Sequence, residues 1–479
     1  MSNEAGFRYK GVAGLGLSLM AGRVAQAVSF LLMARFLSAP SMGKVAIFTA
    51  LFLGFFQLTN LGFDRYIVYA RASDQAELHQ TIDTVWTLQI VRGTLIMLAT
   101  VPVYLLLGFF PQLGISLNEV IGIGAIVFVF SLANPELSSF EREGNFVFVS
   151  RARGLSVVAG ALVMIVLVLV WRSPWVYLIG QMANALALVW LSYHYSTRRP
   201  WFHVDRERMG KVLDYSRHLI LIAAVSFLAT QAQHIYVGAL FGAATLGMYF
   251  TWYRLVNLPG EFVTQMQDRL LFAKASEQSR RQQRNGLTQL VGFGLSMGLL
   301  IPFYVFVWFH GDVLMTLLAG ARWTPFWWGG RMFVCISFLF AVAGTITPFN
   351  LVTVPHLSSR LRTAEALTGF SLILILGPRF GIAGVLAALL TEVSIAVLGR
   401  LYLLYRYIVT ENRGVHLRTA LLILAVMFGP LLAWEAVVGP LLDKRPLAFA
   451  SLAFFLTWTL MLAACVYGAR QRLRTRLLL

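Results

Sequence analysis

Long apolar stretches, separated by short polar or charged segments, occupy almost the whole chain. A helix needs about 20 mostly apolar residues to cross the hydrocarbon core of a bilayer. By that criterion we predict fourteen spans, at 11–37, 43–64, 83–109, 117–135, 153–171, 174–196, 218–241, 245–268, 287–310, 327–350, 363–378, 382–405, 417–437 and 446–469. The first stretch is longer than the apolar region of a signal peptide, so we expect it to be retained.

Composition supports this interpretation. The 479 residues are 58% hydrophobic and 13% charged, whereas a soluble domain carries about 25% charged residues. Such a chain cannot cover a water-facing surface, so we expect an all-α integral membrane protein. Its net charge of +18 then fits Lys and Arg in cytoplasmic loops that face anionic lipid, rather than nucleic-acid binding.

Basic residues predict the orientation of the spans. Most of the 39 Lys and Arg residues fall on one side when the N-terminus is placed in the cytoplasm, including the clusters Thr197–Arg217, Arg269–Arg284 and Arg470–Arg476. The positive-inside rule therefore places both termini in the cytoplasm. The longest outside loop, about Gly311–Phe326, has no room for a folded domain, which argues against a membrane glycan polymerase or glycosyltransferase.

An internal repeat divides the chain. Gly43 matches Gly247, and Asp64-Arg65 matches Asp268-Arg269, both 204 residues further on; ARASDQ (70–75) then matches AKASEQ (273–278). This offset covers six spans, an even number, so both copies face the same way. We therefore predict two parallel six-helix bundles, 1–200 and 201–410, related by an axis along the membrane normal, with two additional helices and a basic tail in 411–479.

Two segments resemble a known family. ARFLSAPSMGKVAIFTALFLGFFQLTNLGFDRYIVYARASD (34–74) resembles the opening of the polysaccharide-transport, or oligosaccharide flippase, family of the multidrug, oligosaccharidyl-lipid and polysaccharide exporter superfamily. GPRFGIAGVLAALLTEV (377–393) is similar to the Gly-rich hairpin between spans eleven and twelve of that family. In one departure from the family pattern, Asn60 occupies a position that is often acidic in relatives.

The resemblance implies a function. It implies alternating access of two lobes and the flipping of an undecaprenyl-pyrophosphate-linked oligosaccharide across the bacterial inner (plasma) membrane, for O-antigen or exopolysaccharide biosynthesis. It also implies extra helices that form a groove for the lipid tail. The expected partners are this lipid-linked oligosaccharide, membrane lipid, a polysaccharide polymerase and a chain-length regulator. A cation-coupled multidrug antiporter of the same superfamily is the alternative.

Three arginines lie at mid-span positions, where an ionisable group costs at least about 2.5–3.5 kcal/mol unless it faces a cavity or a partner. Arg23 lies in the first span, Arg254 in the eighth and Arg92 in the third. Because a guanidinium donates two hydrogen bonds at once and stays protonated, we hypothesise that Arg23 and Arg254 hold the diphosphate, with Arg92 as a weaker candidate. Alternatively, each arginine pairs with a nearby carboxylate, such as Arg254 with Glu261.

Other polar groups within spans have two interpretations. Gln231, Gln233 and His234 either hydrogen-bond sugar hydroxyls or bridge helices. Glu261 and Glu392 are candidates for ion coupling; alternatively, Glu392 forms a buried ion pair with Arg400 or is a neutral acid.

The repeated charge pairs Asp64-Arg65 and Asp268-Arg269 suggest a gate at the inner face, although charges at helix ends are common at membrane surfaces. The chain has no Gly-rich phosphate loop followed by Lys-Ser or Lys-Thr, and its scattered histidines lack metal-ligand spacing. We therefore expect neither an enzyme nor a metal or cofactor site.

Overall fold

The computed structural model describes residues 20–59, 63, 66–67, 75–142, 146–203, 205–280, 286–409 and 412–476, without the side chains of several stretches such as 215–222, 265–270 and 462–476. Two compact units, Met1–Phe250 and Thr251–Leu479, make up the chain. In the described residues every regular element is a helix.

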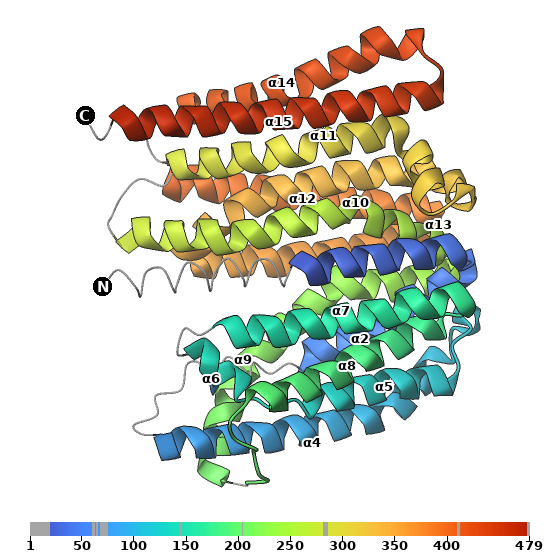
Figure 1. The fold of residues 1–479 in the computed structure, drawn as a ribbon, viewed down its shortest axis with the longest axis vertical. Coiled ribbons are helices and arrows are strands. Elements are labelled where there is room, and N and C mark those ends of the chain that lie inside the picture. Colours follow the sequence, from blue (N-terminus) through green and yellow to red (C-terminus); the bar gives the residue numbers. More distant parts are fainter. Residues whose placement is uncertain are drawn as a thin grey trace. The chain divides into compact units, whose positions relative to one another are not determined.

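The first unit contains a helix at residues 20–36, followed by α2 (Ala39–Thr59), α4 (Gln75–Leu107), η1 (Pro111–Leu113), α5 (Leu117–Ser131), α6 (Leu137–Arg142), α7 (Phe146–Val170), α8 (Trp175–Tyr195), α9 (Arg206–Phe227), η2 (Leu228–Ala232) and the beginning of α10 (Gln233–Arg280) (Figure 1). The second unit contains the rest of α10, α11 (Gly286–Leu318), η3 (Ala321–Phe326), α12 (Trp327–Thr353), α13 (Pro355–Leu403), η4 (Leu404–Ile408), α14 (Arg413–Val438), η5 (Gly439–Leu441) and α15 (Lys444–Arg476).

Two of these long elements are helical hairpins that turn at a glycine. In α10 the hydroxyl of Tyr249 donates a hydrogen bond of 3.1 Å to Gln233 Oε1, although 16 residues of straight helix would separate them by about 24 Å. The chain reverses at Gly242, whose φ of 81° and ψ of 167° belong to a region that only glycine adopts without strain.

The second hairpin turns at Gly381 in α13, with φ 65° and ψ −149°. Here the carboxyl group of Glu392 lies directly against Gly369 on the other arm. A straight helix would place these two residues about 35 Å apart. The Gly-rich segment 377–393 therefore forms the hairpin that its resemblance implied.

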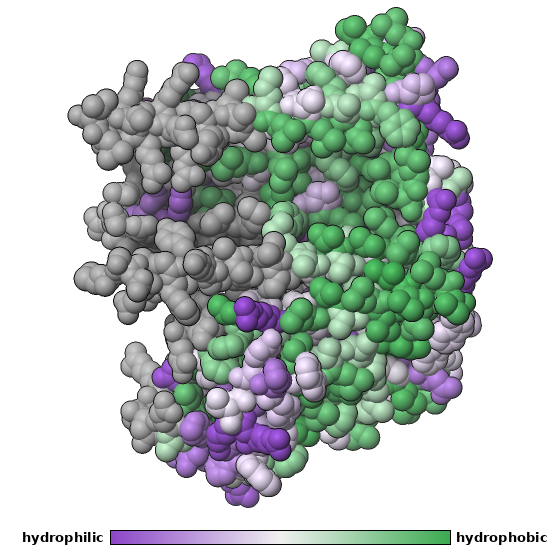
Figure 2. Space-filling view, in the orientation of Figure 1, coloured by the Kyte–Doolittle hydropathy of each residue, from purple (hydrophilic) through white to green (hydrophobic). Residues whose placement is uncertain are grey.

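Side chains that point outward from the helices are mostly apolar. In the first unit, Leu98, Leu105 and Val166 are exposed, and in the second, Leu398 and Leu460 are exposed. Figure 2 shows hydrophobic residues over much of the visible surface of the helices. An exposed apolar surface of this extent is unusual for a water-soluble protein. It is the surface expected of a protein whose helices contact lipid.

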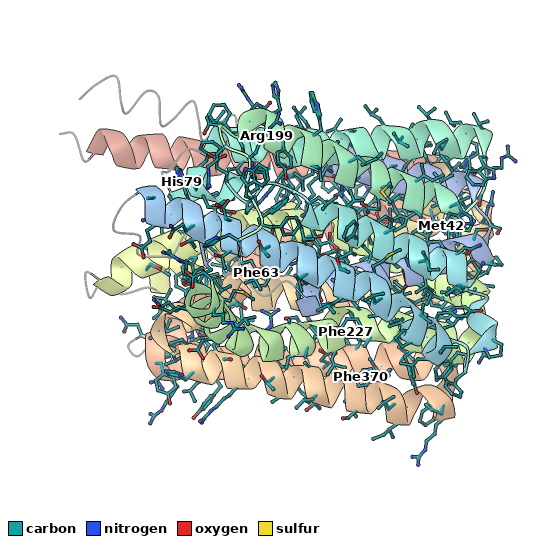
Figure 3. All side chains as sticks on the ribbon, turned by 90° about the horizontal axis from the view of Figure 1, so that it is seen from below. Met42, Phe63, His79, Arg199, Phe227 and Phe370 are labelled. Atoms are coloured by element: carbon teal, nitrogen blue, oxygen red, sulfur yellow. The ribbon has the colours of Figure 1, made fainter. Side chains whose placement is uncertain are left out.

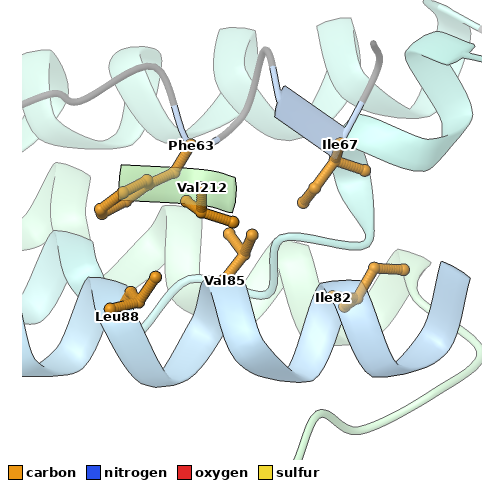
Figure 4. Packing of buried hydrophobic residues seen from close by; sticks show 6 residues of the cluster. All are labelled: Phe63, Ile67, Ile82, Val85, Leu88 and Val212. Carbon is orange, nitrogen blue, oxygen red and sulfur yellow. The ribbon is translucent and has the colours of Figure 1, made fainter. Parts of the chain in front are cut away.

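A separate apolar cluster packs the beginning of α4 against α9. Ile82, Val85 and Leu88 of α4 surround Val212 of α9, and Phe63 completes the contact (Figure 4). These positions of α4 follow a spacing of three residues, which places them on one face of the helix. The cluster therefore attaches the polar first half of α9 to α4.

The predicted fold class is confirmed. Within the described residues, nine helices are long and apolar enough to cross a membrane, and Leu117–Ser131 is a shorter apolar helix. Two of the nine, Ala223–Thr264 and Pro355–Ile408, contain the glycine hairpins and thus two predicted spans each. Each of the fourteen predicted spans falls at least in part on helical residues. The lobe boundaries near residues 200 and 410 stay a prediction.

We predict that Gly242→Ala and Gly381→Ala each lower the thermal stability of the purified protein. A Cβ would meet nothing within 4 Å at either position, so the whole effect comes from the backbone conformation, which costs a residue other than glycine about 1–3 kcal/mol. The measurement is the unfolding midpoint in detergent. Gly429→Ala in α14 is the matched control, because its Cβ also meets nothing but its φ is helical; an equal loss there would contradict the explanation.

Candidate functional site

Arg254 lies on the second arm of α10, paired with a carboxylate of the same helix. Its Nη1 donates hydrogen bonds to both Glu261 oxygens, at 2.9 and 3.2 Å. Residues seven apart lie on one helix face two turns from each other, and both side chains are long enough to span that distance. About a third of each side chain stays exposed (28% and 36%), so the pair is accessible rather than sealed.

A polar network next to this pair connects α10 to α12. Ser337 Oγ donates a 2.9 Å hydrogen bond to Asn257 Oδ1, and Asn257 Nδ2 donates another to the carbonyl of Tyr253. The ring of Tyr253 packs edge-on against Phe333, with centroids 5.6 Å apart. These contacts fix the turn of α10 that carries Arg254.

Arg23 is exposed on the helix at residues 20–36. Its neighbour Gly22 packs against Val157 of α7, where an added Cβ would meet the valine at 3.2 Å. Among the described residues the Arg23 guanidinium has no hydrogen-bond or ion-pair partner. Arg23 and Arg254 belong to different units, so the idea that they face one cavity stays a prediction.

Arg92 is half-buried on α4. Its guanidinium carbon lies 5.8 Å from the centre of the Phe63 ring, a distance at which a cation is attracted by the face of the ring. The structure thus brings Arg92 next to the apolar cluster between α4 and α9. The neighbouring Asp64 and Arg65, one half of the predicted gate, lie outside the described residues, as do the side chains of Asp268 and Arg269 in the other half.

Gln231, Gln233 and His234 are all buried beside the Gly242 hairpin. Gln231 Nε2 donates to Thr230 Oγ1 at 3.2 Å. Gln233 accepts from Tyr249 across the hairpin, and the His234 ring packs edge-on against the rings of Tyr249 and Phe250. The contacts of Gln233 and His234 join the two arms of the hairpin, as the bridging interpretation expects, whereas the hydrogen bond of Gln231 is to its neighbour in the chain. Whether they also contact substrate stays a prediction.

Arg400 pairs with Glu365, so the alternative in which it neutralises Glu392 is wrong. Arg400 Nη1 donates to Glu365 Oε1 at 2.5 Å across the α13 hairpin, and Nε donates to Thr347 Oγ1 of α12 at 3.0 Å. Glu392 lies about two turns before Arg400 on the same arm of α13. It is half-buried, and it has no cationic partner among the described residues.

Two further ion pairs and one buried histidine–carboxylate hydrogen bond join segments that are far apart in the sequence. Lys44 of α2 pairs with the buried Glu119 of α5 at 3.1 Å, and Arg198 pairs with Asp83 at 2.7 Å. In the second unit His310 Nε2 lies 2.9 Å from Glu435 Oε1, and both groups are buried. Sequence reasoning missed these pairs because their members are 75, 115 and 125 residues apart, and single residues carry no signal of such pairing.

The segment between α8 and α9 is attached to the first unit by two buried carboxylates. The peptide nitrogen of Arg198 donates to Glu136 and that of Trp201 donates to Asp83. Asp205 then caps α9, and the hydrogen bond from the peptide nitrogen of Arg208 holds the pKa of Asp205 below its ordinary value. The connection between the two copies of the repeat thus begins as a fixed segment. Figure 3 shows Arg199, within this segment, and His79 of α4.

Solved structures share this fold. The chain is similar to a structure titled "Lipid II flippase MurJ, inward closed conformation", with a TM-score of 0.72, 14% identity, and coverage of 95% of this chain and 99% of the other. It is also similar to an inward-facing multidrug resistance MATE family transporter of the MOP superfamily (TM-score 0.60, 15% identity, 83% and 98% coverage). A third similar structure is the MATE multidrug transporter DinF-BH in complex with R6G (TM-score 0.55, 14% identity, 83% and 95% coverage).

At these identities the structures show the fold alone, and no curated protein matches the sequence. The family comparison is more specific. The model of a family described as "Polysaccharide biosynthesis protein" matches residues 32–327, which is more than half of the chain and includes the segment 34–74 that suggested such a family. The chain therefore belongs to this polysaccharide biosynthesis protein family.

Proposed function

We propose that this protein is a flippase that translocates an undecaprenyl-pyrophosphate-linked oligosaccharide across the bacterial inner membrane by alternating access. The observation that carries the proposal is the family match over residues 32–327 in a chain whose fold resembles that of a lipid II flippase. Polysaccharides are built on lipid carriers, and a chain of membrane-spanning helices supplies a path for such a carrier rather than an active site. The protein then acts without covalent chemistry.

Arg23 and Arg254 are the proposed ligands of the diphosphate. The hydrogen bonds between Arg254 and Glu261 use Nη1 alone, so Nε and Nη2 keep donors for an anion. Arg23 is exposed and unpaired among the described residues. Glu261 positions the Arg254 guanidinium in the substrate-free protein. When substrate binds, phosphate oxygens replace this carboxylate, so the arginine charge is balanced both with and without substrate.

Glu392 is the proposed ion-coupling group. A carboxyl group at span depth is costly when charged, and Arg400 on the same arm of α13 is occupied by Glu365. Uptake of a proton or a metal cation neutralises Glu392. Glu261 is the second candidate, because binding of a diphosphate to Arg254 would release it. The pairs Asp64-Arg65 and Asp268-Arg269 are the proposed inner gate.

The proposed orientation and partners follow from the charge distribution and from the proposed substrate. Both termini lie in the cytoplasm, following the distribution of Lys and Arg. A polysaccharide polymerase and a chain-length regulator act on the product at the outer face. Gln233 and His234 bridge the arms of the Gly242 hairpin, Gln231 is a proposed contact for sugar hydroxyls, and Arg92 is a secondary contact for the substrate.

A cation-coupled multidrug antiporter is the second candidate function. The MATE-like fold and the unpaired Glu392 favour it, since a carboxylate suits an organic cation. Expression of the protein in cells that lack their own efflux pumps distinguishes the two: an antiporter lowers accumulation of a cationic dye such as ethidium, whereas a flippase of anionic lipid carriers leaves it unchanged.

We predict that Arg254→Ala and Arg23→Ala each lower glycan export about 10- to 100-fold, because each removes charge-assisted hydrogen bonds worth about 1.5–3 kcal/mol. The measurement is surface glycan, together with accumulation of undecaprenyl-linked glycan on the cytoplasmic face, in cells that contain only the variant. Arg151→Ala, which removes an exposed arginine of α7, is the matched control. Export at the wild-type rate with normal protein levels would remove either arginine from the mechanism.

We also predict that Glu392→Gln makes export insensitive to the proton gradient, because an amide of the same shape takes up neither a proton nor a cation. Export is followed in vesicles with and without an ionophore that dissipates the gradient. Thr391→Val changes the exposed neighbouring residue and should keep the wild-type response. A Glu392→Gln protein that still slows when the gradient collapses would show that coupling lies elsewhere.

A further inference from the structure

The beginning of α12, in the second unit, carries an arginine that its neighbours hold in one orientation. The guanidinium carbon of Arg331 lies 3.9 Å from the centre of the Trp327 ring and 5.6 Å from that of the Trp308 ring, both within the range of a cation–π attraction. Its Nε donates a 3.1 Å hydrogen bond to the carbonyl oxygen of Trp308. Two aromatic rings and one backbone acceptor therefore fix this guanidinium.

The two terminal nitrogens of this guanidinium remain available to a ligand. Among the described residues, Nη1 and Nη2 of Arg331 have no hydrogen-bond or ion-pair partner. Together these nitrogens can donate two parallel hydrogen bonds to two oxygens of one phosphate or carboxylate group. Because the rings already order the side chain, an anion that binds here does not have to immobilise it.

The charges around Arg331 leave it without a neutralising carboxylate. Lys444, the first residue of α15, lies over the same tryptophan ring, with Nζ 4.8 Å from its centre. This lysine is ion-paired with Asp312 of α11, so the nearby carboxylate is already in use. Asp443 and Arg445 flank the lysine, are both exposed and have opposite charges. The described part of this region therefore offers Arg331 no acidic partner.

The position of Arg331 near a helix N-terminus also favours an anion. α12 starts at Trp327, its N-cap residue Phe326 makes no side-chain hydrogen bond, and its first turn contains no acidic residue. The partial positive charge at the beginning of a helix disfavours a cation and favours an anion. Side chains of a helix tilt toward its N-terminus, so the charge of Arg331 lies toward that end.

This end of the second unit has the features of a membrane–water interface. Trp308 and Trp328 are exposed, and tryptophan is enriched at the level of the lipid headgroups. The connection between α11 and α12 and the one between α14 and α15 lie at this same end (Figure 1). The predicted orientation places it at the outer face, where the positive-inside rule leaves few basic residues.

We infer that Arg331, held in place by Trp327 and Trp308, binds the phosphate group of a lipid at the outer face of the membrane. Two lipids have this chemistry, namely the diphosphate carrier after its translocation and an anionic phospholipid such as phosphatidylglycerol. The inference rests on the proposed function for the orientation and for the first of these two sources. With the carrier as ligand, the site receives the product after it has left Arg254.

The first test measures phosphate binding by the purified full-length protein. Arg23→Ala and Arg254→Ala are introduced together, so that the other proposed phosphate ligands do not contribute. The probes are farnesyl diphosphate and a short-chain phosphatidylglycerol. We expect Arg331→Ala to weaken the binding of at least one probe about tenfold, which corresponds to about 1.4 kcal/mol. Arg379→Ala is the matched control, because Arg379 is an exposed arginine at the α13 hairpin of the same unit.

The two probes distinguish the sources. A loss confined to farnesyl diphosphate supports a site for the carrier, and an equal loss for both probes supports a site for phospholipid headgroups. Unchanged binding of both probes by Arg331→Ala would overturn the inference. Arg331→Lys keeps the charge but cannot donate two parallel hydrogen bonds, so we expect it to lose most of the same affinity; full affinity in this variant would overturn the proposed geometry.

A second variant tests the aromatic support without a change of charge. Trp327→Leu removes the ring under Arg331 and should weaken binding of the same probe severalfold. Trp328→Leu is the control, because this exposed tryptophan packs against Phe326. Affinity at the parent level in Trp327→Leu would overturn the role of the ring. The unfolding midpoint of each variant is measured alongside, and if Trp327→Leu fails to fold, the comparison of Arg331→Lys with Arg379→Ala decides.

The face of the membrane is tested in intact cells. In a background with Cys335→Ser and Cys465→Ser, we expect a membrane-impermeant maleimide to label Ala321→Cys, an exposed position in η3. Arg360→Cys, exposed near the beginning of α13, should react only after the membrane is permeabilised. The reverse pattern would place Arg331 at the inner face and overturn the inference.

This inference and the proposed function fail separately. If deletion of the protein leaves export of undecaprenyl-linked glycan intact while phosphate binding still depends on Arg331, the phosphate site stands and the flippase proposal falls. If export depends on the protein but Arg331→Ala binds both probes with unchanged affinity, the flippase proposal stands and the phosphate site falls.

Discussion

In lipid the backbone has no water to bond, so every peptide group must find its partner within the protein. This constraint explains why the described chain consists of helices, and it governs the places where helices must end or turn. At Gly242 and Gly381 the chain reverses between two spans within a single residue of non-helical conformation. A side chain at these points would strain a backbone that has no alternative partner nearby.

In lipid an unpaired charge is costly, so the pairing of each charged group shows how it is used. Most buried carboxylates here have partners from distant segments: Glu119 with Lys44, Glu365 with Arg400, and Glu435 with His310. Against that background, the groups that remain accessible or unpaired stand out, namely Arg23 and Glu392. Arg254 is intermediate, because its carboxylate partner lies on the same helix and both remain partly exposed.

The repeat gives the first unit a feature that neither copy has alone. Ala39–Gly43 and Ala243–Gly247 are ordinary helix beginnings in the sequence, yet they meet about a local two-fold axis. In this contact each glycine lies against the backbone of the alanine that begins the other motif. Duplication thus supplies a symmetric contact between the two copies.

Local pattern alone determined the spans, the lipid-facing character and the repeat, because hydrophobic length and periodicity depend only on neighbours in the chain. It also placed Glu261 within reach of Arg254, since both lie on one helix face. Only the tertiary structure decided that Arg400 binds Glu365 rather than Glu392, because the Gly381 hairpin brings together residues 35 positions apart. The same holds for Lys44 with Glu119 and for the crossing of Gly43 with Gly247, where the partner depends on how separate helices pack.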